Sequence, residues 1–224
     1  MPTASARLRR KLALVEPALS WPGRLLYEHP RARELYARYL EVSAFLALAT
    51  PPLLELALER ARARAAGDAV AAGLAEYLER HIPEETHGEE PGREVLADLE
   101  ALGVDTAELR VGALPRKIAA VIGTQAFWIW HAHPVAVLGF LEIEGFHPDP
   151  ASVERLIEKT GLPRAGFRQL LLHAELDAEH AAELHHVLDS LPLNPQHERL
   201  IGLSALQTIA LLNEVGLEIV AEEE

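Results

Sequence analysis

The chain has 224 residues, of which 49% are apolar and 25% are charged, and its formal net charge is −13. This composition is that of a globular domain and not of a disordered segment, while the acidic balance argues against a nucleic-acid partner. The absence of cysteine excludes disulfides, iron–sulfur clusters, zinc–thiolate sites and a cysteine nucleophile.

No window approaches the ~18 uncharged apolar residues that a membrane-spanning helix needs. A basic cluster near the N-terminus is followed by Glu16 and Pro17 instead of an apolar run, so it lacks the form of a signal peptide. We therefore expect a cytoplasmic protein without a membrane partner.

Ala, Leu, Glu and Arg dominate the chain, and alternating β-branched runs are almost missing, which predicts an all-α fold. Proline and glycine divide it into predicted helices over residues 31–49, 53–66, 74–81, 93–102, 115–130, 134–145, 152–160, 164–191 and 197–220. Seven or more helices with short connections suit one bundle, so we predict a single domain over residues 1–224. The first ~20 residues and the acidic tail 222–224 are expected to be peripheral.

Histidine is unusually frequent, with eleven residues, and the histidines form groups beside carboxylates. An isolated histidine is more often solvated or part of a core, but grouping favours a metal site. The groups are His81 and His87, then His131 and His133, then His173, His180, His185 and His186.

The strongest pattern is His173, Asp177 and His180, which occupy positions i, i+4 and i+7 of one predicted helix. These positions share one helix face, so two imidazoles and a carboxylate could converge on iron, manganese or zinc. Leu176 and Leu184 flank this face and indicate that it points inward. A solvated acidic face is the equally open alternative, because three glutamates lie close by.

A second pattern is Glu84-x-x-His87, the spacing that di-iron carboxylate bundles use on a helix. Glu85 is a competing ligand, and His81 lies one turn earlier. The alternative is an acidic helix end, because glutamates follow directly.

A third pattern is the uninterrupted apolar run 135–141, which ends at Glu142 and Glu144. Because unpaired burial of a carboxylate is costly, one of these two could bridge metals while the other faces solvent. Alternatively, both lie at an exposed helix end. A further carboxylate could come from Glu41 or Glu55, although a surface position is favoured for each.

These motifs, in this order, resemble those of the haem-oxygenase-like di-iron oxidases and oxygenases, many of which are known only as iron-containing redox enzymes. The likeness rests on residues 81–87 with 98–103 behind them, 133–145 and 173–180, within about residues 75–190. The resemblance implies the helical bundle shared with thiaminase-II-like proteins and with the oxidase that forms pyrroloquinoline quinone.

Carried over residue by residue, the resemblance implies six metal ligands: Glu84, His87, Glu144, His173, Asp177 and His180. Glu144 is preferred to Glu142 because Gly145 follows it, as in the family. The chain departs from the family at two points: Gly88 stands where members often carry histidine, and the early-helix carboxylate has no clear counterpart. Possible additional or supporting ligands are His81, Glu85, Glu142, Glu41 and Glu55.

The implied function is O₂-dependent oxidation of a small organic molecule in a buried cavity, with two iron ions per chain. A single iron ion or manganese is an alternative, as is a metal-free scaffold or binding protein of the same fold. Phe127, Trp128, Trp130 and Phe140 are candidates for the cavity wall, although aromatic residues on helices more often belong to a core. Further expected partners are an electron donor and a second copy of the chain in a homodimer.

Overall fold

The computed structural model describes residues 2–15, 28–86, 92–111, 116–144 and 148–221, with the backbone alone for residues 84–86, 108, 110–111 and 175–179. Within these ranges the regular structure is helical and contains no strand, which confirms the all-α prediction. The α-helices are α1 (Ala4–Ala13), α3 (Ala32–Arg64), α4 (Ala69–Thr86), α5 (Arg93–Ala101), α6 (Thr106–Val111), α7 (Arg116–His131), α8 (Val137–Glu144), α9 (Pro150–Thr160), α10 (Arg168–Ser190) and α11 (Pro195–Ala221). Two 3₁₀ turns, η1 (Pro134–Ala136) and η2 (Arg164–Gly166), precede α8 and α10.

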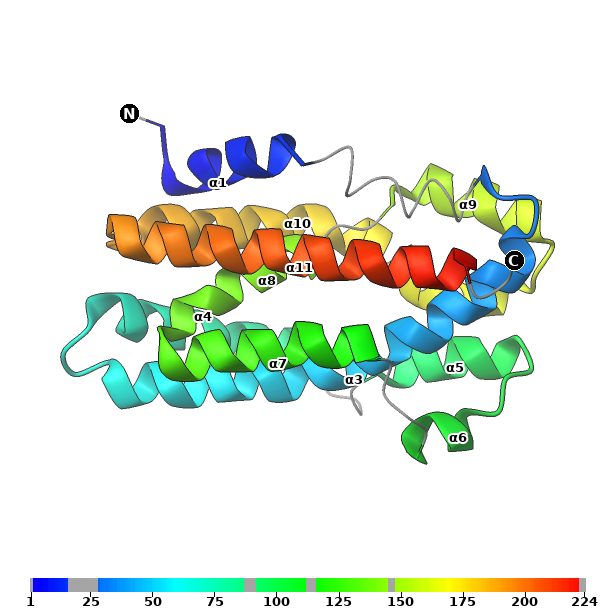
Figure 1. Ribbon diagram of the computed structural model, residues 1–224, viewed down its shortest axis with the longest axis horizontal. Helices are drawn as coiled ribbons and strands as arrows, with labels where there is room; N and C mark the ends of the chain where they lie inside the picture. The colour runs from blue at the N-terminus through cyan, green and yellow to red at the C-terminus, as the bar shows by residue number, and fades with distance from the viewer. Residues whose placement is uncertain (1, 16–27, 87–91, 112–115, 145–147, 222–224) are drawn as a thin grey trace.

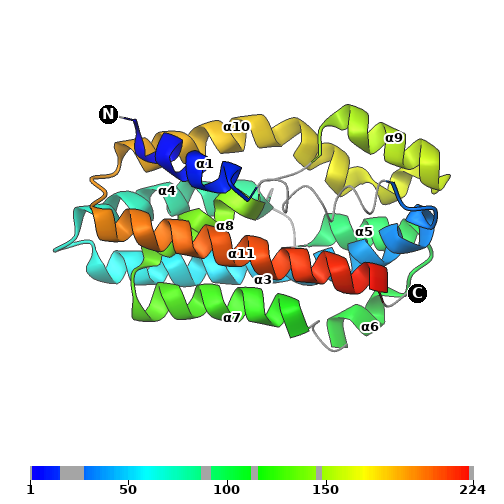
Figure 2. The same cartoon turned by 45° about the horizontal axis from the view of Figure 1, so that its top comes forward.

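The longer helices run along the long axis of the molecule and surround the short helix α8 (Figures 1 and 2). Helix α3 packs against α4 and α7, and α11 packs against α7 and α8. Helix α10 contacts α8 from another side. Helices α8 and α10, which carry most of the predicted ligands, are therefore neighbours in the bundle.

Two of the predicted helices, 31–49 and 53–66, form the single 33-residue helix α3, which continues through Pro51 and Pro52. Proline removes the N–H that would bond one turn back and normally kinks or ends a helix. Here both halves of α3 bury apolar side chains, among them Leu40 before the prolines and Leu54 after them. This packing outweighs the lost backbone hydrogen bonds, which a sequence pattern does not reveal.

Helix α4 shows the same effect, because it continues through Pro83 to Thr86 although we expected a disturbance there. The helix predicted from residue 93 agrees closely with α5. After it, Gly103 adopts a positive φ of 82°, and its N–H donates to the carbonyl of Glu100. This is the left-handed ending that glycine permits after a helix.

The buried apolar side chains form two clusters, one toward each end of the bundle. Helices α3, α7, α10 and α11 contribute to both clusters and so connect them. The first cluster includes Leu54, Leu74, Leu138, Leu188 and Ile201; the second includes Leu35, Leu99, Ile118, Leu156 and Phe167.

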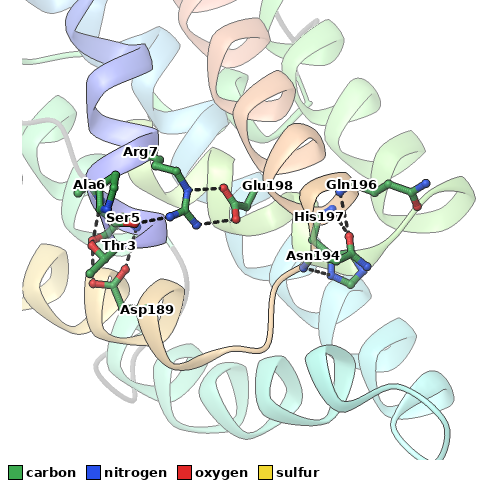
Figure 3. Close-up of polar contacts among 10 residues, drawn as sticks. Thr3, Ser5, Ala6, Arg7, Asp189, Asn194, Gln196, His197 and Glu198 are labelled. Atoms are coloured by element: carbon green, nitrogen blue, oxygen red, sulfur yellow. Dashed lines mark hydrogen bonds and ion pairs between the residues drawn. The ribbon is translucent and has the colours of Figure 1, made fainter.

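Helix α1 belongs to this core, although we expected the first residues to be peripheral. Its Leu8 and Leu12 are buried in the first cluster. The Ser5 N–H and hydroxyl both donate to the carboxylate of Asp189 on α10, at 2.8 and 2.9 Å (Figure 3). Arg7 donates to both carboxylate oxygens of Glu198 on α11, at 2.7 and 2.6 Å (Figure 3). The amphipathic pattern of α1 therefore reflects docking on α10 and α11.

By length and composition, α3 and α11 are apolar enough to cross a membrane. Each exceeds 18 residues and includes a strongly apolar stretch with at most two charged residues. Core helices of soluble proteins pass the same test, and both helices contribute side chains to the two clusters.

The start of α10 is held by residues from two other helices. No side chain of its own caps α10; instead, Asp98 of α5 accepts a hydrogen bond from the Gln169 N–H at 2.9 Å. The Tyr36 ring stacks on Phe167, with centroids 4.2 Å apart, and its hydroxyl donates to the Gly166 carbonyl at 2.8 Å. These contacts position the helix that bears His173, Asp177 and His180.

Candidate functional site

Helices α4 and α10 bring two of the predicted histidines together. His81 on α4 is only 3% exposed, and its ring lies edge-to-face with that of His180 on α10, with centroids 5.8 Å apart. Tyr77, one turn earlier on α4, stacks on His81 at 5.0 Å. His180 therefore lies on the side of α10 that faces α4, in agreement with the inward orientation inferred from the flanking leucines.

The two carboxylates of α8 both have partners within the bundle. Glu142 is about nine-tenths buried, and its Oε1 lies 3.2 Å from Nε2 of His185 on α10. Glu144 is half-buried, and its Oε1 accepts a hydrogen bond from the Thr50 hydroxyl of α3 at 2.6 Å. The expectation that one of the two would face solvent is therefore wrong, and the reason is that α8 lies between α3 and α10.

The remaining predicted ligands lie partly outside the described residues. Glu84 and Asp177 are on α4 and α10, but their side chains are not described, and the same holds for Glu85. His87 also lies outside the described residues. His173 is half-buried on α10, two turns before His180. The convergence of all six ligands thus stays a prediction.

The candidate early-helix carboxylates occupy surface-type positions on α3. Glu41 forms an ion pair with Arg38 at 2.7 Å, and Glu55 is exposed. Thr50 and His185 contact the α8 carboxylates, although neither was among the predicted ligands. No local sequence pattern indicates that Thr50 contacts Glu144, because the two residues are 94 positions apart.

The side chains of α4, α8 and α10 offer imidazole nitrogens and carboxylate oxygens, which are ligand atoms that iron binds. Glu142 adds a second observation: its Oε2 is buried and has no hydrogen-bond partner among the described residues. A buried carboxylate oxygen without a partner is costly, and a metal ion or a protonated ligand would satisfy it.

The predicted cavity wall is wrong for two of its four aromatic residues. Phe127 and Trp130 are 55% and 47% exposed, because they lie on the outward face of α7, opposite the buried Val121 and Ile129. Phe140 is fully buried in the core. Trp128 is half-buried, and its indole N–H donates to the Gln207 side chain of α11 at 3.2 Å.

A separate group of potential ligands, Asp68, His133 and His197, lies where three turns meet. Among the described residues it is the one group of three His, Asp or Glu whose ligand atoms all lie within 4.8 Å of one another. Asp68 Oδ2 lies 2.9 Å from Nε2 of His133, and the His133 and His197 rings are 4.7 Å apart. By composition and spacing this group could hold a metal ion.

Each member of this group also accepts a hydrogen bond from a backbone N–H at or next to the start of a helix. Asp68 Oδ1 accepts from the N–H groups of Val70 and Ala71 at the start of α4, at 2.9 and 3.1 Å. His133 Nδ1 accepts from the Val135 N–H at the start of η1, at 3.1 Å. His197 Nδ1 accepts from the Asn194 N–H at 3.4 Å, and the Asn194 side chain caps α11 (Figure 3).

These hydrogen bonds set the tautomer of both neutral rings. Because Nδ1 accepts a hydrogen bond in each, the neutral imidazole carries its proton on Nε2, and a metal ion at Nε2 would have to break the cap. Burial lowers the pKa of His133, and the Asp68 carboxylate only partly offsets this. Burial also opposes ionisation of Asp68, but hydrogen bonds from His133 and two backbone N–H groups lower its pKa on balance. We therefore interpret the group as a structural contact that links the starts of α4, η1 and α11.

Comparison with known proteins shows a likeness in fold. No family model matches the chain, and neither does any curated protein. A solved structure from Shewanella denitrificans OS217, described as a domain of unknown function with a heme oxygenase-like fold, superposes with a TM-score of 0.78. The match covers 97% of this chain and 92% of that chain at 14% sequence identity, a level that shows the fold alone. The chain therefore has a haem-oxygenase-like helical fold.

Proposed function

We propose that the protein is a non-haem iron-dependent oxidase or oxygenase that uses O₂ to oxidise a small organic molecule. The observation that carries this proposal is the meeting of His81 and His180 between α4 and α10. The buried carboxylate of Glu142 on α8, paired with His185 of α10, adds to it. Imidazoles and carboxylates contributed by facing helices are the donor set of iron sites in helical bundles.

Six residues would hold the iron: Glu84, His87, Glu144, His173, Asp177 and His180. When bound, iron supplies the redox chemistry that O₂ activation requires. The surrounding residues orient the ligands. Thr50 donates to Glu144, and Tyr77 packs against His81, so that these side chains are fixed before any ion arrives. Burial of Glu142 and His81 keeps water away from this part of the site.

A site with one metal ion is the second candidate. Glu41 and Glu55 are the early-helix carboxylates considered for a second ion, but one is paired with Arg38 and the other is exposed. A single ion would then be held by His173, Asp177 and His180, with manganese as an alternative to iron.

Anaerobic loading with Fe²⁺, followed by desalting and iron analysis, tests the proposal. The wild type should retain about two iron ions per chain, or about one under the second candidate. The substitutions Asp177→Ala and His180→Ala should each lose at least half of the bound iron, because each removes a ligand that the others cannot replace. His186→Ala is the matched control, since His186 is exposed on the same helix.

An oxygen electrode gives a second readout of the same preparations. Iron-loaded wild type should consume O₂ faster than the same concentration of free Fe²⁺, and His180→Ala should not. Less than one iron ion per wild-type chain, or iron content unchanged in both ligand variants, would contradict the proposal.

A further inference from the structure

Beyond its first two residues, Arg116 and Lys117, the outward face of α7 carries no formal charge. Residues 118–132 contain no Asp, Glu, Lys or Arg, although the chain has 34 acidic and 21 basic residues. Ala119, Ala120 and Gly123 are exposed on this face, and the large side chain of Phe127 is more than half exposed. An uncharged, apolar helix face of this kind usually marks a contact surface.

Helix α11 widens this face. It lies beside α7 in both views (Figures 1 and 2) and contacts it along its length. Exposed Leu203, Ala210 and Leu217 recur on α11 at helical spacing, in line with Gln207. The same line contains exposed Glu214, which pairs with Lys117 of α7. Between the helices is a surface groove of about 390 Å³, lined by Ala120, Gly123, Thr124, Phe127, Trp128 and Gln207.

The sizes of the side chains along α7 make this face complementary to itself. Three residues of this face follow one another at intervals of four: Ala119, Gly123 and Phe127. The first has a small side chain, the second has none, and the third has a large one. If two α7 helices cross antiparallel at Gly123, each Phe127 lies opposite the Ala119 of the other helix. A Cβ on Gly123 would meet no atom of its own chain within 4 Å, so the crossing point is open to a close neighbour.

We propose that a second copy of this chain covers the α7–α11 face, with the two α7 helices antiparallel across a two-fold axis near Gly123. Charge supports a second copy as the occupant. Two chains of net charge −13 repel each other over most of their surfaces, and they meet at least cost along the uncharged stretch of α7 from Ala119 to Phe127. The antiparallel arrangement also places Arg116 of each copy beside the C-terminal turn of the other α7, where the helix dipole is negative.

A single introduced cysteine tests this arrangement, because the natural chain has none. Gly123→Cys places a thiol next to the proposed two-fold axis, so that oxidation or a short bis-maleimide linker should give a covalent dimer in high yield. Gly67→Cys is the matched control: Gly67 is exposed and equally free of neighbouring atoms, but it lies in the turn after α3. It should give only background cross-linking.

Mass measurement in solution completes the test. By light scattering the wild type should have twice the chain mass of 24.6 kDa, and Phe127→Glu should have the single-chain mass with an unchanged helical spectrum. Leu14→Glu, which changes a more exposed leucine at the C-terminal end of α1, should remain a dimer. Three results would each overturn the proposal: a wild type of single-chain mass, a dimer that survives Phe127→Glu, or equal cross-linking of the two cysteine variants.

Discussion

The buried carboxyl of Asp98 is the residue whose protonation the fold alters most clearly. Burial raises its pKa from 3.8 to about 6, although backbone N–H groups at the start of α10 oppose this. The folded chain thus binds the Asp98 proton more tightly than the unfolded chain does. The free energy of unfolding should therefore fall as the pH rises from about 4 to about 6.

Asp98→Asn isolates this effect, because asparagine has no charge and keeps an oxygen for the Gln169 N–H. Relative to the variant, the wild type should lose about 3 kcal/mol of stability between about pH 4 and pH 7, from a pKa difference near two units. Urea unfolding of both proteins at several pH values measures it. A stability difference that does not change with pH would show that Asp98 keeps its ordinary pKa in the folded chain.

At the scale of elements, the contact between α8 and α11 depends on Gly139. A Cβ at this position would lie 2.2 Å from the Ile201 carbonyl oxygen and 2.9 Å from the Ala205 nitrogen, both rigid backbone atoms of α11. Gly139→Ala should therefore separate the helices and lower the free energy of unfolding by about 2–3 kcal/mol.

Gly202→Ala on α11 is the control for this substitution. Its new methyl group would meet only the flexible Lys11 side chain, at 3.3 Å. Because alanine favours the helix, this variant should be as stable as the wild type or up to ~1 kcal/mol more stable. Urea titration at one fixed protein concentration compares the two, so that any dimerisation affects both alike. Equal stability of the two variants would mean that α8 and α11 do not approach as closely as described.

At the scale of the whole molecule, Asp68, His133 and His197 join three turns at one end of the bundle. His133→Ala would remove the acceptor of the Val135 N–H and the ring that contacts Oδ2 of Asp68. The expected cost is about 1–3 kcal/mol in the free energy of unfolding, from buried groups left unsatisfied.

His131→Ala is the matched control, because His131 is exposed two residues earlier. It should change stability by less than about 0.5 kcal/mol. Thermal and urea unfolding measure both variants. If the two substitutions have equal effects, the hydrogen bond between His133 and Asp68 does not contribute to the stability of the folded chain.

The sequence by itself determined the helical class and most helix positions, and it indicated the inward side of α10 at His180, which the contact with His81 then decided. These features follow from local rules, since apolar spacing, glycine caps and proline starts act within a few residues. The resemblance to haem-oxygenase-like proteins also came from the sequence, and the structural comparison confirms the fold.

Only the tertiary structure decided that α3 and α4 continue through their prolines, that Phe127 and Trp130 face outward, and that both α8 carboxylates face inward. It also decided that Thr50 and His185 contact those carboxylates, across 94 and 43 residues of sequence. The physical reason is the same in each case. Packing between distant segments outweighs local preference, and a single sequence does not record which segments will meet.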